Sequence, residues 1–342
     1  MKSLALAGLL LLVAALAGSA GARVGVASKA APKIKRVVMP RPRKLPAGAR
    51  TFTAPGGAWR GDLTDLAAGE DAMWVSSNRG VYRIDRTSGT ITGPFGGEAQ
   101  DVAVGGGAVW TADYDDGLVK RLDGTGRVTK VVQLPDGASP EGIVATADGV
   151  WVGDESSGLV ERLNPANGTV VTKIRVSRAA ATIRVVGLGL GSVWVDNADA
   201  NVVARIDIAT DRVLARIHVP SSAAACGGIA VGARAVWVTS CLERTRISRI
   251  DPRTNKVAAV LRVGGKVIQP VGDGRSVWFV VGGDDGSPAS RHGYLVHLRG
   301  NDTATARFDL GRGFRSGGAA IAFGALWLSD FVHPDVVRLE LR

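Results

Sequence analysis

The chain has 342 residues, of which 46% are hydrophobic, and a formal net charge of +11 at pH 7. Ten of its basic residues and none of its acidic residues lie in the first 50 positions, which leaves a net charge of only +1 for residues 51–342. A nucleic-acid-binding domain would be expected to carry its Lys and Arg on a folded face. Nucleic acid is therefore not expected as a partner.

Residues 1–22 have the pattern of a secretory signal peptide. Lys2 supplies the charge, residues 4–17 form an apolar stretch, and Ala20 and Ala22 frame a cleavage site. A transmembrane helix needs about 20 apolar residues, so we expect cleavage, while an uncleaved segment would act as an anchor. The mature protein is predicted to be extracytoplasmic, either secreted or associated with the cell wall.

Residues 23–49 follow as a basic segment with four prolines and no acidic residue. Pro favours extended backbone, and like charges repel. The composition predicts a disordered linker, which would contact an anionic cell wall or lipid headgroups or remain solvated without a partner.

A repeat then runs to the end of the chain. An apolar residue precedes Trp seven times, at Trp74, Trp110, Trp151, Trp194, Trp237, Trp278 and Trp327, and the spacings are 36, 41, 43, 43, 41 and 49 residues. A period near forty, with four strand-length segments in each repeat, is typical of a β-propeller. The sequence predicts an all-β, seven-bladed β-propeller of four-stranded blades over residues 50–342.

The fifth repeat shows the four strands most clearly, at residues 228–231, 235–238, 246–250 and 257–263, named a to d from the inside outwards. Between strands c and d, Asp85, Asn164, Asp207 and Asp251 begin short polar segments. Their side chains are expected to form tight turns by accepting hydrogen bonds from the backbone two residues on.

Each predicted strand c also carries one basic residue, at Arg83, Arg121, Arg162, Arg205, Arg249, His297 and Arg338. One such residue in every blade predicts a repeated contact with a neighbouring ring. The seventh repeat ends after three strands, and residues 50–54 form a strand-like segment before the first repeat. We expect this N-terminal strand to complete blade seven and close the ring.

The segments around Trp151 and Trp194, residues 227–232 and residues 248–257 resemble YVTN-type β-propeller repeats and the neighbouring group that includes virginiamycin B lyase. The resemblance covers about residues 50–342. It implies a seven-bladed ring that binds ligands at the mouth of its central channel. The lyase group uses His, Glu and a divalent metal there and commonly places His just before strand a. This chain has Pro140 and Glu141, Cys226, or Gln269 and Pro270 at that position.

Strands a begin and strands b end on one face of a propeller, here called the top face. The third residue after each repeat Trp should lie there, and these residues include Asp113, Asp154, Asn197 and Asp330. Carboxylates before or within strand a, at Asp65, Asp101 and Glu141, should join them. Oxygen ligands that converge in this way suit Ca²⁺ or Mg²⁺, for which Asp101, Asp113, Glu141 and Asp154 are the candidate ligands. The alternative is a hydrated acidic rim, because Asx residues also favour loop ends.

Two further pairs of residues are candidates for chemistry or cross-linking. His292 and His333 fall in the loops between strands b and c of adjacent blades and are candidate acid/base residues or metal ligands. Cys226 and Cys241 should lie opposite each other in blade five and form a disulfide in an exported protein.

The favoured function is non-catalytic binding of a small molecule, glycan or protein on the acidic top face, with no required cofactor. The alternative is a divalent-metal-dependent lyase or lactonase.

Overall fold

The computed structural model describes residues 32, 34–53, 63–135, 137–177, 183–220, 228–232, 234–239, 245–272, 276–282, 292–333 and 335–341. The predicted signal peptide, Cys226 and Cys241 lie outside these residues. The described residues form strands and turns without a helix, and none of them belongs to a helix long and apolar enough to span a membrane.

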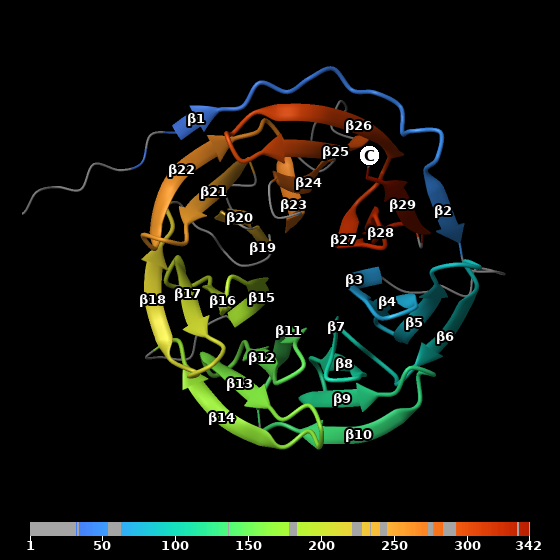
Figure 1. Cartoon of the computed structure of the whole chain (residues 1–342), viewed down its shortest axis with the longest axis vertical. Coiled ribbons are helices and arrows are strands. Elements are labelled where there is room, and N and C mark those ends of the chain that lie inside the picture. The colour runs from blue at the N-terminus through green and yellow to red at the C-terminus, as the bar shows by residue number, and fades with distance from the viewer. Residues whose placement is uncertain are drawn as a thin grey trace, which may run out of the picture. The chain divides into compact units, whose positions relative to one another are not determined.

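The strands from residue 34 onwards form seven sheets that stand side by side in a ring (Figure 1). Blades 1 to 4 contain β3 (Leu63–Ala68), β4 (Ala72–Ser77), β5 (Gly80–Asp85) and β6 (Ile91–Phe95); β7 (Asp101–Gly105), β8 (Ala108–Asp113), β9 (Leu118–Leu122) and β10 (Val128–Gln133); β11 (Pro140–Ala145), β12 (Val150–Asp154), β13 (Leu159–Leu163) and β14 (Val170–Arg175); and β15 (Ile183–Gly189), β16 (Ser192–Asn197), β17 (Val202–Asp207) and β18 (Val213–His218).

The last three blades include two strands from the N-terminal segment. They contain β19 (Ile229–Gly232), β20 (Ala235–Thr239), β21 (Arg246–Asp251) and β22 (Lys256–Arg262), with β1 (Ile34–Arg36) outside β22; β23 (Lys266–Gly272), β24 (Ser276–Gly282), β25 (His292–Arg299) and β26 (Ala304–Arg312); and β27 (Ser316–Ala322), β28 (Ala325–Asp330) and β29 (Asp335–Glu340), with β2 (Arg50–Thr53) outside β29. The predicted seven-bladed β-propeller of four-stranded blades is confirmed.

The core lies between the blades. Its buried apolar side chains form seven clusters, and each cluster draws its members from two adjacent blades. All seven repeat Trp side chains are buried in them. Burial of a ring of this size contributes on the order of 2–3 kcal/mol. The repeat therefore encodes contact between neighbouring blades, which holds the ring together.

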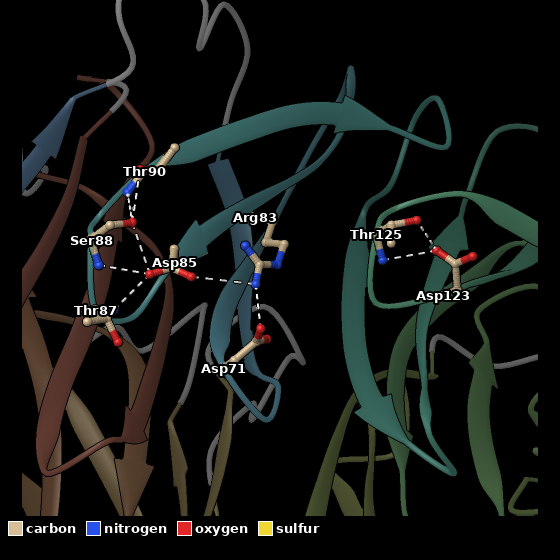
Figure 2. Close-up of polar contacts among 8 residues, drawn as sticks. All are labelled: Asp71, Arg83, Asp85, Thr87, Ser88, Thr90, Asp123 and Thr125. Atoms are coloured by element: carbon tan, nitrogen blue, oxygen red, sulfur yellow. Dashed lines mark hydrogen bonds and ion pairs between the residues drawn. The ribbon is translucent and has the colours of Figure 1, made fainter.

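The basic residue of strand c lies over the Trp of strand b in the same blade, as the repeat predicts. In blades 2, 3, 4, 5 and 7 the guanidinium carbon stands 4.9–5.9 Å from the Trp ring centroid. In blade 6, His297 stacks on Trp278 with centroids 4.2 Å apart. In blade 1, Arg83 is opposite Trp74 and pairs with Asp71 at 2.7 Å (Figure 2).

The turns between strands c and d are built by Asx side chains, as predicted. Asp85 Oδ1 accepts hydrogen bonds from the backbone N–H of Thr87 and Ser88 at 3.0 and 2.8 Å (Figure 2). Asn164, Asp207 and Asp251 accept corresponding bonds from the residue two positions on. These hydrogen bonds explain why Asp or Asn stands at each of these turns, and no ligand is needed to explain it.

The N-terminal strand closes the ring. β2 pairs antiparallel with β29, from Arg50 opposite Arg338 to Thr53 opposite Asp335. Phe52 is buried and stacks on Trp327, with centroids 5.3 Å apart. The outer edge of blade seven is thereby covered, as the sequence predicts.

The preceding segment differs from its prediction. Within the predicted disordered linker, residues 34–49 run along the outer side of blades 5 and 6 (Figure 1). Backbone bonds hold it there, from Val37 N–H to Arg262 O and from Arg43 N–H to Arg307 O. Val37 is buried, and Met39 and Leu45 pack against the core clusters. Composition alone missed this because the segment's few apolar residues find their partners only on the assembled blades. We call residues 34–53 the strap.

Candidate functional site

A channel of about 680 Å³ runs along the axis of the ring. The innermost strand of every blade lines it, from β3 in blade 1 to β27 in blade 7 (Figure 1). Strands a carry small and aliphatic residues over most of their length. Their few acidic side chains stand at or near the start of the strand, which is the end at the top face. Asp65, Asp101 and Glu141, here called the acidic wall, line the channel on blades 1 to 3.

Asp65 and Asp101 occupy equivalent places, two residues before the residue that pairs with the repeat Trp of their blades. Their carboxyl groups are hydrogen-bonded to each other. Burial, followed by repulsion from Asp101, raises the pKa of Asp65 well above its usual range. Burial also raises the pKa of Asp101, although hydrogen bonds from Asp65 and from the backbone oppose this change.

The backbone decides which of the two carboxyl groups is ionised. The N–H groups of Val102 and Ile143 donate to Asp101 at 2.9 and 3.1 Å, which favours its carboxylate form. Asp65 has one such backbone donor, Leu66, which lowers its pKa less than burial and Asp101 raise it. Asp65 therefore holds the shared proton and donates it to Asp101. Since Ile143 belongs to blade 3, the pair and its donors connect three neighbouring blades.

Two glycines of blade 7 make room for this pair. A Cβ at Gly318 would lie 2.6 Å from Asp65 Cα and 2.8 Å from its Oδ1. At Gly317 a Cβ would overlap the carbonyl oxygen of Leu63. Blades 7 and 1 approach closely here because neither glycine carries a side chain.

The remaining acids near the top of blades 2 and 3 form an electrostatically coupled rim. The pKa of Tyr114 is raised, first by its hydrogen bond to Glu155, and also by burial and by the charges of Glu155 and Glu141. Burial and the charges of Asp115, Asp113 and Asp116 raise the pKa of Glu98. These acids therefore lie close enough to one another to interact electrostatically.

Asp113, at the end of strand b in blade 2, has a cation as its partner. It is buried, and its Oδ2 accepts a hydrogen bond from Lys120 Nζ at 2.6 Å. Its Oδ1 accepts one from the N–H of Asp116 at 3.2 Å. The carboxylate thus holds the turn between strands b and c and neutralises a Lys that is itself buried.

Asp154 and Asn197 take the same position in blades 3 and 4 and bind backbone. Asp154 Oδ1 accepts hydrogen bonds from the N–H groups of Ser139 and Ser156, each at 3.0 Å. Asn197 Oδ1 accepts one from Ala200 N–H at 3.2 Å. Each side chain fixes a loop of its own blade. Both stand three residues after the repeat Trp, so the repeat places them at the same loop.

Asp330 and the two histidines form separate contacts. Asp330 Oδ1 accepts from the N–H groups of Arg315 and Val332, and its Oδ2 lies 3.0 Å from His333 Nδ1. His292 Nδ1 lies 3.1 Å from Asp309 Oδ1 on the outer strand β26. Each histidine is paired with a different carboxyl group.

Metal ligation was a second prediction for these residues. Among the described residues, no group of three or more His, Cys, Asp or Glu side chains is placed to hold a metal ion. Of the four candidate ligands, Asp101 shares a proton with Asp65, while Asp113 and Asp154 bind Lys120 and the backbone.

Sequence analysis did not single out the basic residues that line the channel. Lys266 on β23 and Arg315 just before β27 belong to blades 6 and 7 and line the same cavity as the acidic wall. Both stand twelve residues before the repeat Trp of their blade, and this shared offset was the signal in the sequence. Gln269, also in the channel wall, has a φ of 45° and donates a hydrogen bond to the Gly317 carbonyl.

The fold is shared with several solved structures. A catalytically inactive variant of virginiamycin B lyase from Staphylococcus aureus with quinupristin is 15% identical, with a TM-score of 0.70 over 86% of this chain and 99% of that chain. A streptogramin B lyase is 17% identical, with a TM-score of 0.70 over 86% of this chain and 97% of that one. BamB from Moraxella catarrhalis is 15% identical, with a TM-score of 0.59 over 82% and 83% of the two chains. At these identities the similarity shows the fold alone. No protein-family model and no curated protein sequence matches the chain.

Proposed function

We propose that the chain is a non-catalytic binding propeller whose ligand is a small molecule with a basic nitrogen, held against the acidic wall. The observation that carries this proposal is the hydrogen-bonded pair Asp65 and Asp101 on the channel wall. A positive group beside the pair favours its fully ionised form. Binding would therefore expel the shared proton and replace it with the ligand's own charge.

The rest of the channel suits a ligand with a second, negative or polar end. Lys266 and Arg315 line the cavity from blades 6 and 7, while the acidic wall belongs to blades 1 to 3. A volume of about 680 Å³ falls within the range of about 300–1,000 Å³ that is usual for small-molecule pockets. This size favours a small molecule over the glycan or protein partners that the acidic face also suggested.

The direct test is thermal melting of the chain with a set of small amines and amino acids at millimolar concentration. A binder should raise the melting temperature, and Asp65→Asn and Asp101→Asn should each abolish the rise. Asp207→Asn, at an outer turn, is the matched control and should leave it intact. Titration calorimetry in buffers of different ionisation enthalpy should detect proton release, which identifies the pair as the binding group. A rise that survives both substitutions would place the ligand elsewhere.

A metal-dependent lyase or lactonase is the second candidate, because two of the similar structures are lyases. It would require an ion held by Asp101, Asp113, Glu141 and Asp154, and two of these side chains already bind Lys120 and the backbone. Melting with Ca²⁺ or Mg²⁺ separates the candidates. A rise that is lost in Asp113→Asn would favour the ion, and a response to amines alone favours the binding propeller.

A further inference from the structure

The strap presents a fixed set of positive charges on the outer side of the ring. It contains Lys35, Arg36, Arg41, Arg43, Lys44 and Arg50 and no acidic residue. Parallel pairing of β1 with β22 and the bonds between Arg43 and β26 attach it to blades 5 and 6. Its charges therefore keep a defined arrangement against the blades.

Most of these charges have no acidic partner among the residues that the structure describes. Lys35 pairs with Asp302 at 3.3 Å. Within the described part of the chain, no carboxylate forms an ion pair with Arg36, Arg41, Arg43 or Lys44, nor with Arg262 on the neighbouring strand β22. Among the described residues, these charges keep their positive potential on this face.

Two of the arginines are placed directly against each other. Arg36 on β1 pairs in register with Arg262 on β22, and Arg262 pairs in register with Arg246 on β21. Like charges in directly opposite positions of a sheet are destabilising. An anion that bound across Arg36 and Arg262 would relieve this repulsion, so the register itself favours a negatively charged partner.

A cavity and two protruding aliphatic side chains accompany the charges. The cavity, of about 780 Å³, is lined by residues 36–39 of the strap, residues 262–264 and Arg307. Ile34 and Val38 stand two residues on either side of Arg36, and their side chains are 51% and 83% exposed. Transfer of exposed aliphatic groups from water to an apolar phase is favourable, so a partner that offers such a phase would gain from these two side chains.

We propose that this face, made by Ile34, Arg36, Val38, Arg43 and Arg262, docks on the surface of an anionic phospholipid bilayer. Basic side chains are attracted to anionic lipid phosphates, and apolar side chains among them insert below the headgroups. A soluble polyanion would use the arginines and leave Val38 in water. The combination of unpaired cations with the 83% exposed Val38 favours the membrane.

The test is co-sedimentation of the full chain with vesicles of phosphatidylcholine, alone or mixed with phosphatidylglycerol. We expect stronger binding to the anionic vesicles, and this additional binding should weaken as salt screens the charges. The triple variant Arg36→Gln, Arg43→Gln, Arg262→Gln should bind anionic vesicles on the order of 100-fold more weakly, because each charge near the surface contributes about 1 kcal/mol. The apolar segment at residues 4–17 is present in every variant, so its contribution cancels.

The matched control is Lys130→Gln, Arg175→Gln, Arg212→Gln, which removes three exposed charges from blades 2 to 4. It should bind anionic vesicles like the unchanged chain, and melting curves should show that both triple variants fold. Val38→Ser should weaken vesicle binding and leave binding to soluble polyphosphate unchanged. Equal binding to both vesicle types, an equal loss in the control, or no effect of Val38→Ser on vesicle binding would each overturn the proposal.

Discussion

The outer turns and the channel wall use the same residue, aspartate, in opposite electrostatic states. At the turns between strands c and d, hydrogen bonds lower the pKa values of three acids: chiefly backbone N–H donors for Asp85 and Asp251, and first the Thr210 hydroxyl, then backbone N–H groups, for Asp207. In the channel, burial raises the pKa values of Asp65 and Asp101. The turn acids are partly exposed, and their lowered pKa values favour the ionised form that holds the turns. The channel acids have raised pKa values that favour retention of a proton, so the same residue type serves different purposes at the two places.

The largest expected effect concerns Asp113, a buried acid made tolerable by a cation. Lys120→Met should lower the free energy of unfolding by about 3 kcal/mol, because it leaves the Asp113 carboxylate buried without its cation. Adding Asp113→Asn should recover part of the loss, since Asn still accepts the Asp116 N–H. Denaturant unfolding of the two single variants and the double variant measures this coupling. Additive losses would mean that the pair does not act as a unit.

Gly318→Ala should lower the free energy of unfolding by about 2 kcal/mol. Its Cβ would meet Asp65 at 2.6–2.8 Å and force blades 7 and 1 apart. Gly124→Ala is the control, because no atom lies within 4 Å of its added Cβ. Thermal melting of both variants checks the prediction. A loss no greater than that of the control would show that the junction adjusts freely.

Asp65→Asn should change the free energy of unfolding by at most about 1 kcal/mol at pH 4, because Asn can also donate to Asp101. A group whose pKa is raised by folding stabilises the protein below its unfolded pKa of about 4, and this stability is lost as the pH rises through the folded pKa. The free energy of unfolding of the variant should therefore rise relative to that of the unchanged chain between pH 4 and 8. Urea unfolding across this range tests it, and a constant difference would contradict a shared proton.

The smallest effect is expected at the outer turns, where Asp207→Ala removes the acceptor for the N–H groups of Ala209 and Thr210. The pKa of Asp207 is lowered by folding, so its stabilising effect is present above about pH 4 and is lost as the pH falls through the folded pKa. Asp207→Asn should lose less stability than Asp207→Ala at pH 7, because Asn keeps an acceptor, as Asn164 does in blade 3, but lacks the negative charge. Asp207→Ala should therefore lose more thermal stability at pH 7 than at pH 3, and the opposite order would contradict a stabilising role for the ionised carboxylate.

The repeat predicted the fold because its signals are local. Trp194 and Arg205 face each other across one pair of strands, and Asp207 turns the chain within five residues, so spacing alone identifies both roles. The same logic located the ends of strands a and b and hence the acidic top face. It also placed residues 50–54 in blade seven, because a missing strand must be supplied from the other terminus.

Only the tertiary structure decided what these side chains contact. Asp65 and Asp101 are 36 residues apart and share a proton because the adjacent blades 1 and 2 pack against each other. Asp113, by contrast, is bound by Lys120, although the sequence placed it on the same top face as Asp101 and made both candidate ion ligands. The strap is fixed by backbone pairing with strands more than 200 residues away. Composition and period describe the neighbours of a residue along the chain, whereas desolvation, proton sharing and strand docking depend on neighbours that only folding supplies.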